Sequence, residues 1–237
     1  MQKISAKNAE QELDSLSSTE KAKLAQRFFK TGKGEYGEGD QFLGITSPEL
    51  RKLARQYQTL PITENAKRLK SKWHEVRAFA LIVLVHQYQL ADTKSQKKIY
   101  RHYIRHKKWI NNWDLVDVSA PSLSGHYFYH TQDKQTLFQL AKSKRMWDRR
   151  IAVVSTLYHI RQNRFQEILQ LSELLLTDQE DLMHKACGWM LREVGKRDQA
   201  ILCKFLNKNA AKMPRTMLRY AIEKFSQVER QKFMQMD

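Results

Sequence analysis

The sequence predicts an all-α protein, and three observations support that fold class. Only 4 proline and 8 glycine residues occur in 237 positions, so long segments are free of helix breakers. Hydrophobic residues make up 41% of the chain and charged residues 28%, which is enough apolar material for a sizeable core. Helix-patterned apolar stretches also recur along the chain at a regular spacing. A recurrence of this kind is typical of stacked helix pairs.

Five positions mark the recurrence, and each lies in an apolar, helix-patterned stretch. Trp113 follows Arg77 by 36 residues, Arg149 and Lys185 each follow after another 36, and Arg219 follows after 34. Helix-pair repeats of this length build curved solenoids whose concave surface suits an extended ligand. We therefore predict a curved solenoid of helix-pair repeats. An irregular helical bundle with accidental spacing is the alternative.

A glycine-rich loop divides the N-terminal part from the repeats. Residues 1–30 have a helical pattern, and five of the eight glycines then fall between Gly32 and Gly44. This stretch lacks the glycine-lysine order of a P-loop and follows no strand, which argues against nucleotide binding. It is either a mobile connector or a loop that approaches a ligand closely, since loops often carry function.

The capping signals agree with this organisation. Ser17-Ser18-Thr19-Glu20 can cap the second of two N-terminal helices, and Thr46-Ser47-Pro48-Glu49 has the signature of a helix start. We find no linker after Thr46. The sequence therefore predicts one domain over residues 1–237, with N-terminal helices and the loop in residues 1–45 and the repeats in residues 46–237.

The net charge of +17 and the pI near 9.9 predict a polyanionic partner, most simply nucleic acid. Lysine and arginine are spread along the chain, which favours a folded surface that follows a phosphate backbone. No apolar run reaches the length of a membrane span, and no signal-peptide stretch is present. We expect a cytoplasmic monomer. Cys187 and Cys203 are too few for a disulfide framework or a four-cysteine zinc site.

Residues 109–117 form the most distinctive stretch, with two tryptophans and two carboxylates in a basic chain. No glycine or proline interrupts it before Pro121, so a helix is expected. Trp113 and Asp117 are four apart and would share one face, where an aromatic plane beside a carboxylate can host a cation. The alternative is a core tryptophan with solvated or arginine-paired aspartates.

Two histidine pairs have the spacing of metal ligands on a helix, His102 with His106 and His126 with His130. Neither pair has the HExxH pattern or an evident third ligand, so we expect neither a metal nor a cofactor.

Three segments resemble the AlkD family of alkylpurine DNA glycosylases: Asn112-Trp113-Asp114-Leu115-Val116-Asp117, Trp147-Asp148-Arg149-Arg150 and Gly188-Trp189-Met190-Leu191-Arg192-Glu193. The resemblance extends from about Phe28 to about Tyr220. It implies HEAT-like helical repeats. It also implies excision of cationic alkylated purines such as 3-methyladenine and 7-methylguanine from duplex DNA, without flipping the base into a pocket.

The same resemblance implies roles for individual residues. The catalytic aspartate falls on Asp117, the two sugar-flanking tryptophans fall on Trp113 and Trp189, and a DNA-contacting arginine falls on Arg150. Phe28 stands where the family has a tyrosine, so a hydroxyl is missing there. Further DNA-binding candidates on the repeat surface are Arg149, Lys185 and Arg219. Gly188 beside Trp189 fits either close approach of a ligand or close helix packing.

Two functions fit these features. One is a DNA glycosylase that stabilises an oxocarbenium-like sugar. The other is a non-catalytic helical-repeat protein that binds branched or distorted DNA on the same basic surface. The set of Trp113, Asp117 and Trp189 favours the glycosylase.

Overall fold

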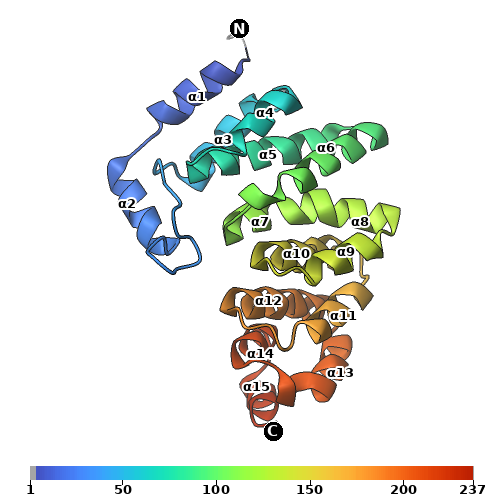
Figure 1. Ribbon diagram of the computed structural model, residues 1–237. Helices are drawn as coiled ribbons and strands as arrows, with labels where there is room; N and C mark the ends of the chain where they lie inside the picture. Colours follow the sequence, from blue (N-terminus) through green and yellow to red (C-terminus); the bar gives the residue numbers. More distant parts are fainter. Residues whose placement is uncertain (1–3, 237) are drawn as a thin grey trace. The chain divides into compact units, whose positions relative to one another are not determined.

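The computed structural model describes residues 4–236, and their regular secondary structure is helical, as predicted (Figure 1). Apart from an isolated bridge between Gln41 and Trp73, no strand pairing occurs among these described residues. Contacts divide the chain into two compact units, one up to Leu123 and one from Ser124 onward. The expectation of one continuous domain remains a prediction, and each unit is described by itself.

The first unit contains the N-terminal helices, the glycine-rich loop and the first helix pairs. Its helices are α1 (Ala6–Ser15), α2 (Thr19–Phe28), α3 (Ser47–Gln56), α4 (Ile62–Arg68), α5 (His74–Leu90), α6 (Thr93–Arg105), the 3-10 turn η1 (Lys107–Trp109) and α7 (Trp113–Ala120). The capping signals are confirmed. The Ser18 side chain accepts a hydrogen bond from the Lys21 amide, and Thr46 and Glu49 form a capping box before α3.

The second unit follows a π-helical turn, η2 (Pro121–Gly125), which contains the boundary. Its elements are α8 (His126–Thr131), α9 (Lys134–Ala141), α10 (Met146–Arg161), α11 (Gln166–Leu174), α12 (Asp181–Arg197), α13 (Gln199–Asn209), the 3-10 turn η3 (Ala210–Lys212), α14 (Arg215–Ala221) and α15 (Gln227–Met234).

The five positions of the sequence repeat all lie in the first two turns of their helices. Each of these helices is the second member of a helix pair. Arg77, Trp113, Arg149, Lys185 and Arg219 belong to α5, α7, α10, α12 and α14. Within the first unit α5 packs against α3 and α7, and within the second α12 packs against α10 and α14. In the first unit α6 also packs against α5, and in the second unit α9, α11 and α13 pack against α10 or α12. The helix-pair repeat is therefore present in each unit.

Helices α5 and α10 are buried around most of their circumference. In α5, Val76 and the run from Ala78 to Leu84 are buried, and in α10 the run from Ile151 to Leu157 is buried. A helix that is apolar on all sides is stable only where other elements cover it. Other helices of the same unit therefore have to pack around α5 and around α10.

One expectation about residues 109–117 is corrected. The helix does not run through this stretch, because it begins at Trp113, after the separate turn η1 and three non-helical residues. Asn112 has an extended backbone and caps α7, and its side-chain oxygen accepts the Trp113 amide at 2.8 Å. The cap satisfies an amide that a helix start leaves without an intrahelical partner.

No helix in the described part of the chain is long and apolar enough to cross a membrane.

Candidate functional site

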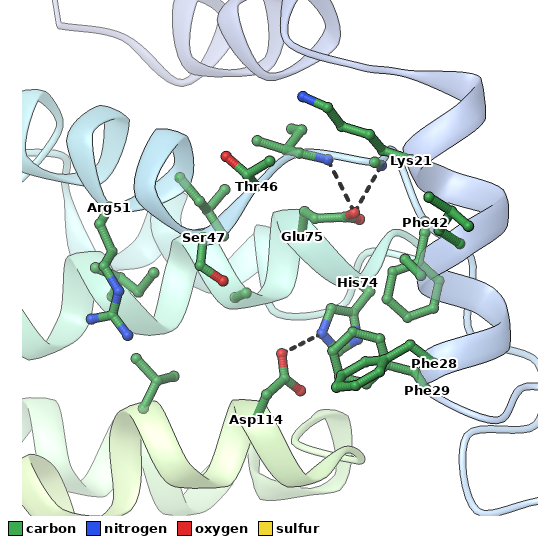
Figure 2. A pocket seen from close by; sticks show the side chains of 18 of the residues that line it. Lys21, Phe28, Phe29, Phe42, Thr46, Ser47, Arg51, His74, Glu75 and Asp114 are labelled. Atoms are coloured by element: carbon green, nitrogen blue, oxygen red, sulfur yellow. Dashed lines mark hydrogen bonds and ion pairs between the residues drawn. The ribbon is translucent and has the colours of Figure 1, made fainter.

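A cavity of about 540 Å³ lies within the first unit. Its walls come from α2, the segment that enters α3, α3 itself, α5 and α7 (Figure 2). Three residues predicted from the sequence lie around it, namely Phe28, Trp113 and Asp117. The other lining residues are Lys21, Leu24, Ala25, Phe29, Phe42, Gly44, Ile45, Thr46, Ser47, Leu50, Arg51, His74, Glu75, Ala78, Ile82, Asp114 and Val118.

Aromatic rings hold Trp113 in place at the start of α7. Its ring stacks on Phe29 with 5.3 Å between centroids and an interplanar angle of 29°, and it meets the edge of Phe28 at 5.8 Å. Its indole Nε1–H donates to the Tyr36 hydroxyl at 3.3 Å. Asp117 lies one helical turn further along α7 and lines the same cavity, as the four-residue spacing predicts.

A network of charged side chains, most of them buried, includes Asp114, the residue that follows Trp113 on α7. The ring nitrogens of His74 contact two carboxylates, Asp40 at 3.1 Å through Nδ1 and Asp114 at 2.7 Å through Nε2. Asp40 also accepts hydrogen bonds from Arg77 at 2.6 Å and from Asn111 and Asn112 at 3.2 Å each. Figure 2 shows the contact between His74 and Asp114 at the cavity wall. Buried charges are tolerated when each has partners of this kind.

The network changes the protonation of its members. Burial by itself lowers the pKa of His74, but the charge of Asp114 and hydrogen bonds to Asp114 and Asp40 outweigh it and raise that pKa to about 9. Burial raises the pKa of Asp40, yet hydrogen bonding to His74 and the charge of Arg77 bring it below its usual value. At neutral pH, His74 is therefore a cation beside the ionised Asp40.

Rings also cover the His74 imidazolium. Phe42 stacks on it with 4.6 Å between centroids and an interplanar angle of 23°, and Phe29 lies 4.9 Å away (Figure 2). A cation over an aromatic face is stabilised by the ring quadrupole, by about 0.5–2 kcal/mol. The His74 cation therefore stabilises the packing of Phe29 and Phe42, and Trp113 in turn stacks on Phe29.

Glu75 follows His74 in the sequence, and it binds the backbone of the segment at one side of the cavity. Its carboxylate accepts the backbone amides of Leu43, Gly44 and Ile45 at 2.9, 2.8 and 3.4 Å, and Figure 2 shows two bonds of this carboxylate. Gly44 has a φ of +82°, and a Cβ on it would lie 2.2 Å from the Ser18 carbonyl oxygen. Only glycine allows this close approach to the start of α2.

Exposed groups border the cavity on α2 and α3. The side chain of Phe28 is 64% exposed and that of Leu24 is 59% exposed. Lys21 and Arg51, both exposed, also line the cavity. Cations placed beside exposed apolar side chains suit a partner that has phosphates and flat bases.

The remaining site candidates belong to the second unit. Trp189, half-buried, and Lys185 lie on α12, where Lys185 pairs with Asp181 at 2.7 Å. Arg219 is exposed on α14. A Cβ on Gly188 would lie 2.5 Å from the Met217 carbonyl oxygen, so this glycine serves the close packing of α12 on α14.

Arg149 and Arg150 make structural contacts at the start of α10. Arg149 forms two hydrogen bonds to Asp178, at 2.7 and 3.1 Å, and donates to the carbonyl groups of Ser143 and Lys144. Arg150 is buried and donates to the Leu182 carbonyl at 2.8 Å. Both side chains therefore stabilise the local fold, whatever further contacts they make.

The histidine pairs have close rings, with centroids 4.3 Å apart for His102 and His106 and 4.2 Å apart for His126 and His130. Among the described residues, no group of three or more histidine, cysteine or acidic side chains is arranged to hold a metal ion.

Sequence reasoning missed Asp40 and His74 in the buried network, and Tyr36, which accepts a hydrogen bond from Trp113. Asp40 and Tyr36 stand in the glycine-rich loop, where the only available signal was an acid and an aromatic among the glycines. His74 opens a helix whose pattern indicated only a core element.

The comparisons with known proteins agree with this fold. The family model described as DNA alkylation repair enzyme matches residues 9–225, and the chain belongs to that family. A solved structure described as "Predicted DNA alkylation repair enzyme from Enterococcus faecalis" is similar, with a TM-score of 0.70. It shares 17% sequence identity, and the match covers 89% of this chain and 97% of that one, which supports the fold. The comparison with curated proteins finds no match.

Proposed function

We propose that this protein is a DNA glycosylase that excises positively charged alkylated purines, such as 3-methyladenine and 7-methylguanine, from duplex DNA. The observation that carries the proposal is that Trp113 and Asp117 line one cavity in a member of the DNA alkylation repair enzyme family. The net charge of +17 supports a DNA partner.

The alkylated base already carries a positive charge, so it leaves readily and needs no general acid. As the bond between the base and the sugar breaks, its electrons go to the base and the deoxyribose becomes oxocarbenium-like. The carboxylate of Asp117 stabilises this cation and orients the water that attacks C1′. The water loses a proton, and the products are the free base and an abasic site.

Trp113 and Trp189 act through their ring faces in this proposal. Each contributes about 0.5–2 kcal/mol of cation–π stabilisation when water is excluded. Groups that are already in position need no reorganisation during the reaction, which is why a fixed tryptophan is more effective than a mobile one. We further propose that the base leaves without entering a pocket, and that Arg219 and Lys185 bind phosphates.

Release of free base tests the proposal. Duplex DNA treated with a methylating agent is incubated with the protein, and released purines are separated by chromatography, with a sample lacking protein as the control for spontaneous loss. We expect 3-methyladenine and 7-methylguanine to appear faster than in the control. DNA binding without any base release would instead support a non-catalytic DNA-binding protein.

A further inference from the structure

The glycine-rich loop is attached to the core of the first unit by a buried carboxylate. Asp40, 7% exposed, accepts hydrogen bonds from His74 and Arg77 on α5 and from Asn111 and Asn112. Those two asparagines directly precede the first residue of α7. The loop and the start of α7 therefore share one anchor, which argues against a mobile connector.

The loop also lies against the end of α2. The amide of Gly37 donates to the Lys30 carbonyl at 3.1 Å, and a Cβ on Gly37 would lie only 2.4 Å from the Phe29 carbonyl oxygen. Glycine is therefore required for this close approach. Tyr36, the preceding residue, is held beside the aromatic end of α2 as a result.

The hydroxyl of Tyr36 links the two aromatic residues of the site. It accepts a hydrogen bond from Trp113 Nε1 at 3.3 Å and donates to the Phe28 carbonyl at 3.5 Å. An indole has a single N–H, so its acceptor determines how the ring can rotate about its side-chain bonds. The stack on Phe29 restrains the ring plane, and the bond to Tyr36 restrains rotation within that plane.

We infer that Tyr36 is a positioning residue for Trp113, and that the glycine-rich loop is part of the site. The inference rests on the proposed function, because positioning matters only if the face of Trp113 stabilises the sugar cation. Tyr36 acts through Trp113 and not on the substrate.

The test is Tyr36→Phe, which removes one oxygen and keeps the ring. We expect single-turnover release of 7-methylguanine to fall about fivefold, equivalent to about 1 kcal/mol at 1.36 kcal/mol per factor of ten. Affinity for an uncleavable duplex should stay within about twofold, because phosphate contacts dominate ground-state binding. Tyr158→Phe is the matched control. Its hydroxyl also lies 3.3 Å from a ring nitrogen, that of His130, and it does not line the cavity.

A spectroscopic measurement separates positioning from chemistry. The five tryptophans give five indole N–H signals, and Trp113→Phe assigns the one from Trp113. In Tyr36→Phe this signal should move or broaden while the other four stay in place, and Tyr158→Phe should leave it unchanged. An unchanged Trp113 signal, or an unchanged excision rate beside active wild-type protein, overturns the inference. If the wild-type protein releases no base, the proposed function fails, and the indole signal alone decides whether Tyr36 holds Trp113.

Discussion

His74 lies between two carboxylates, with Nδ1 toward Asp40 and Nε2 toward Asp114, and aromatic rings cover the imidazole. Its proton is therefore held more tightly in the folded protein than in an unfolded chain. This fixed cation neutralises the carboxylates nearest to it. Asp117 lies about one turn beyond Asp114 on α7 and lines the same cavity.

The raised pKa of His74 predicts how stability depends on pH. Because that pKa is raised from 6.5 to about 9, its stabilising contribution is complete below pH 6.5 and is lost as the pH rises through about 9. At 1.36 kcal/mol per pKa unit, the loss amounts to about 3 kcal/mol. Urea unfolding measured between these pH values should show the decline, and His74→Gln should reduce it. A wild-type stability that stays constant across this range would contradict the assignment.

At the residue scale, the sequence predicted that Trp113 and Asp117 lie close together, but it did not predict which residues surround them. Trp113 and Asp117 could be placed together because a four-residue helical spacing is local information. Asp40 meets His74 and Asn112 across 34 and 72 residues, and a single sequence contains no signal for such contacts. Arg149 pairs with Asp178, 29 residues away, and the sequence contains no signal for that contact either.

At the scale of elements, the same set of arginine contacts is found at the start of two helices of the repeat. Arg77 donates to the carbonyl groups of Ser71 and Lys72 before α5, and Arg149 donates to the equivalent carbonyl groups of Ser143 and Lys144 before α10. Each arginine also pairs with a buried aspartate side chain, Asp40 or Asp178. Arg77 and Arg149 are 72 residues apart, which is twice the 36-residue spacing, and each binds the backbone that leads into its helix.

These contacts predict different effects on stability for two arginines that were both expected to bind DNA. Arg149→Gln should lower the free energy of unfolding by about 3 kcal/mol, because it leaves the buried Asp178 without its partner. Arg219→Gln, on the exposed side of α14, should change stability by less than about 0.5 kcal/mol. Denaturant unfolding of both variants checks this. Equal stabilities would show that the contacts of Arg149 contribute little.

The start of α7 shows why one predicted boundary was wrong. Residues 109–117 contain no helix breaker, so the sequence favoured an unbroken helix. Asn112 instead takes an extended backbone because its side chain serves two purposes, accepting the Trp113 amide and donating to Asp40. A tertiary contact of this kind overrides local helix propensity. The result places Trp113 at the first position of the helix, beside the cavity.

At the scale of the whole molecule, the all-α class and the helix-pair order could be predicted because they depend on periodicity and on the scarcity of glycine and proline. The curved solenoid and the single domain remain predictions. Net charge is also a property of the whole chain. The value of +17 predicts that duplex DNA binds with little sequence preference and with strong salt dependence.

Counterion release gives this prediction a magnitude. The slope of log affinity against log salt concentration should be about −0.9 for each phosphate contacted, so a protein making about six contacts has a slope near −5. Arg219→Gln should reduce the slope by about one contact, whereas Arg149→Gln should leave it unchanged because its guanidinium is held by Asp178. Fluorescence anisotropy over a salt series measures both. An affinity independent of salt would argue against a phosphate-binding surface.

The most direct test of the proposed chemistry is single-turnover release of 7-methylguanine by Asp117→Asn. This variant keeps the shape of the side chain and removes its charge, so excision should fall at least about tenfold while affinity for an uncleavable duplex stays nearly constant. Asp92→Asn, which retains a capping residue at the start of α6 away from the cavity, should excise at the wild-type rate. If Asp117→Asn excised as fast as the wild-type protein, the carboxylate would not stabilise the sugar cation, and the DNA-binding function without catalysis would replace the glycosylase.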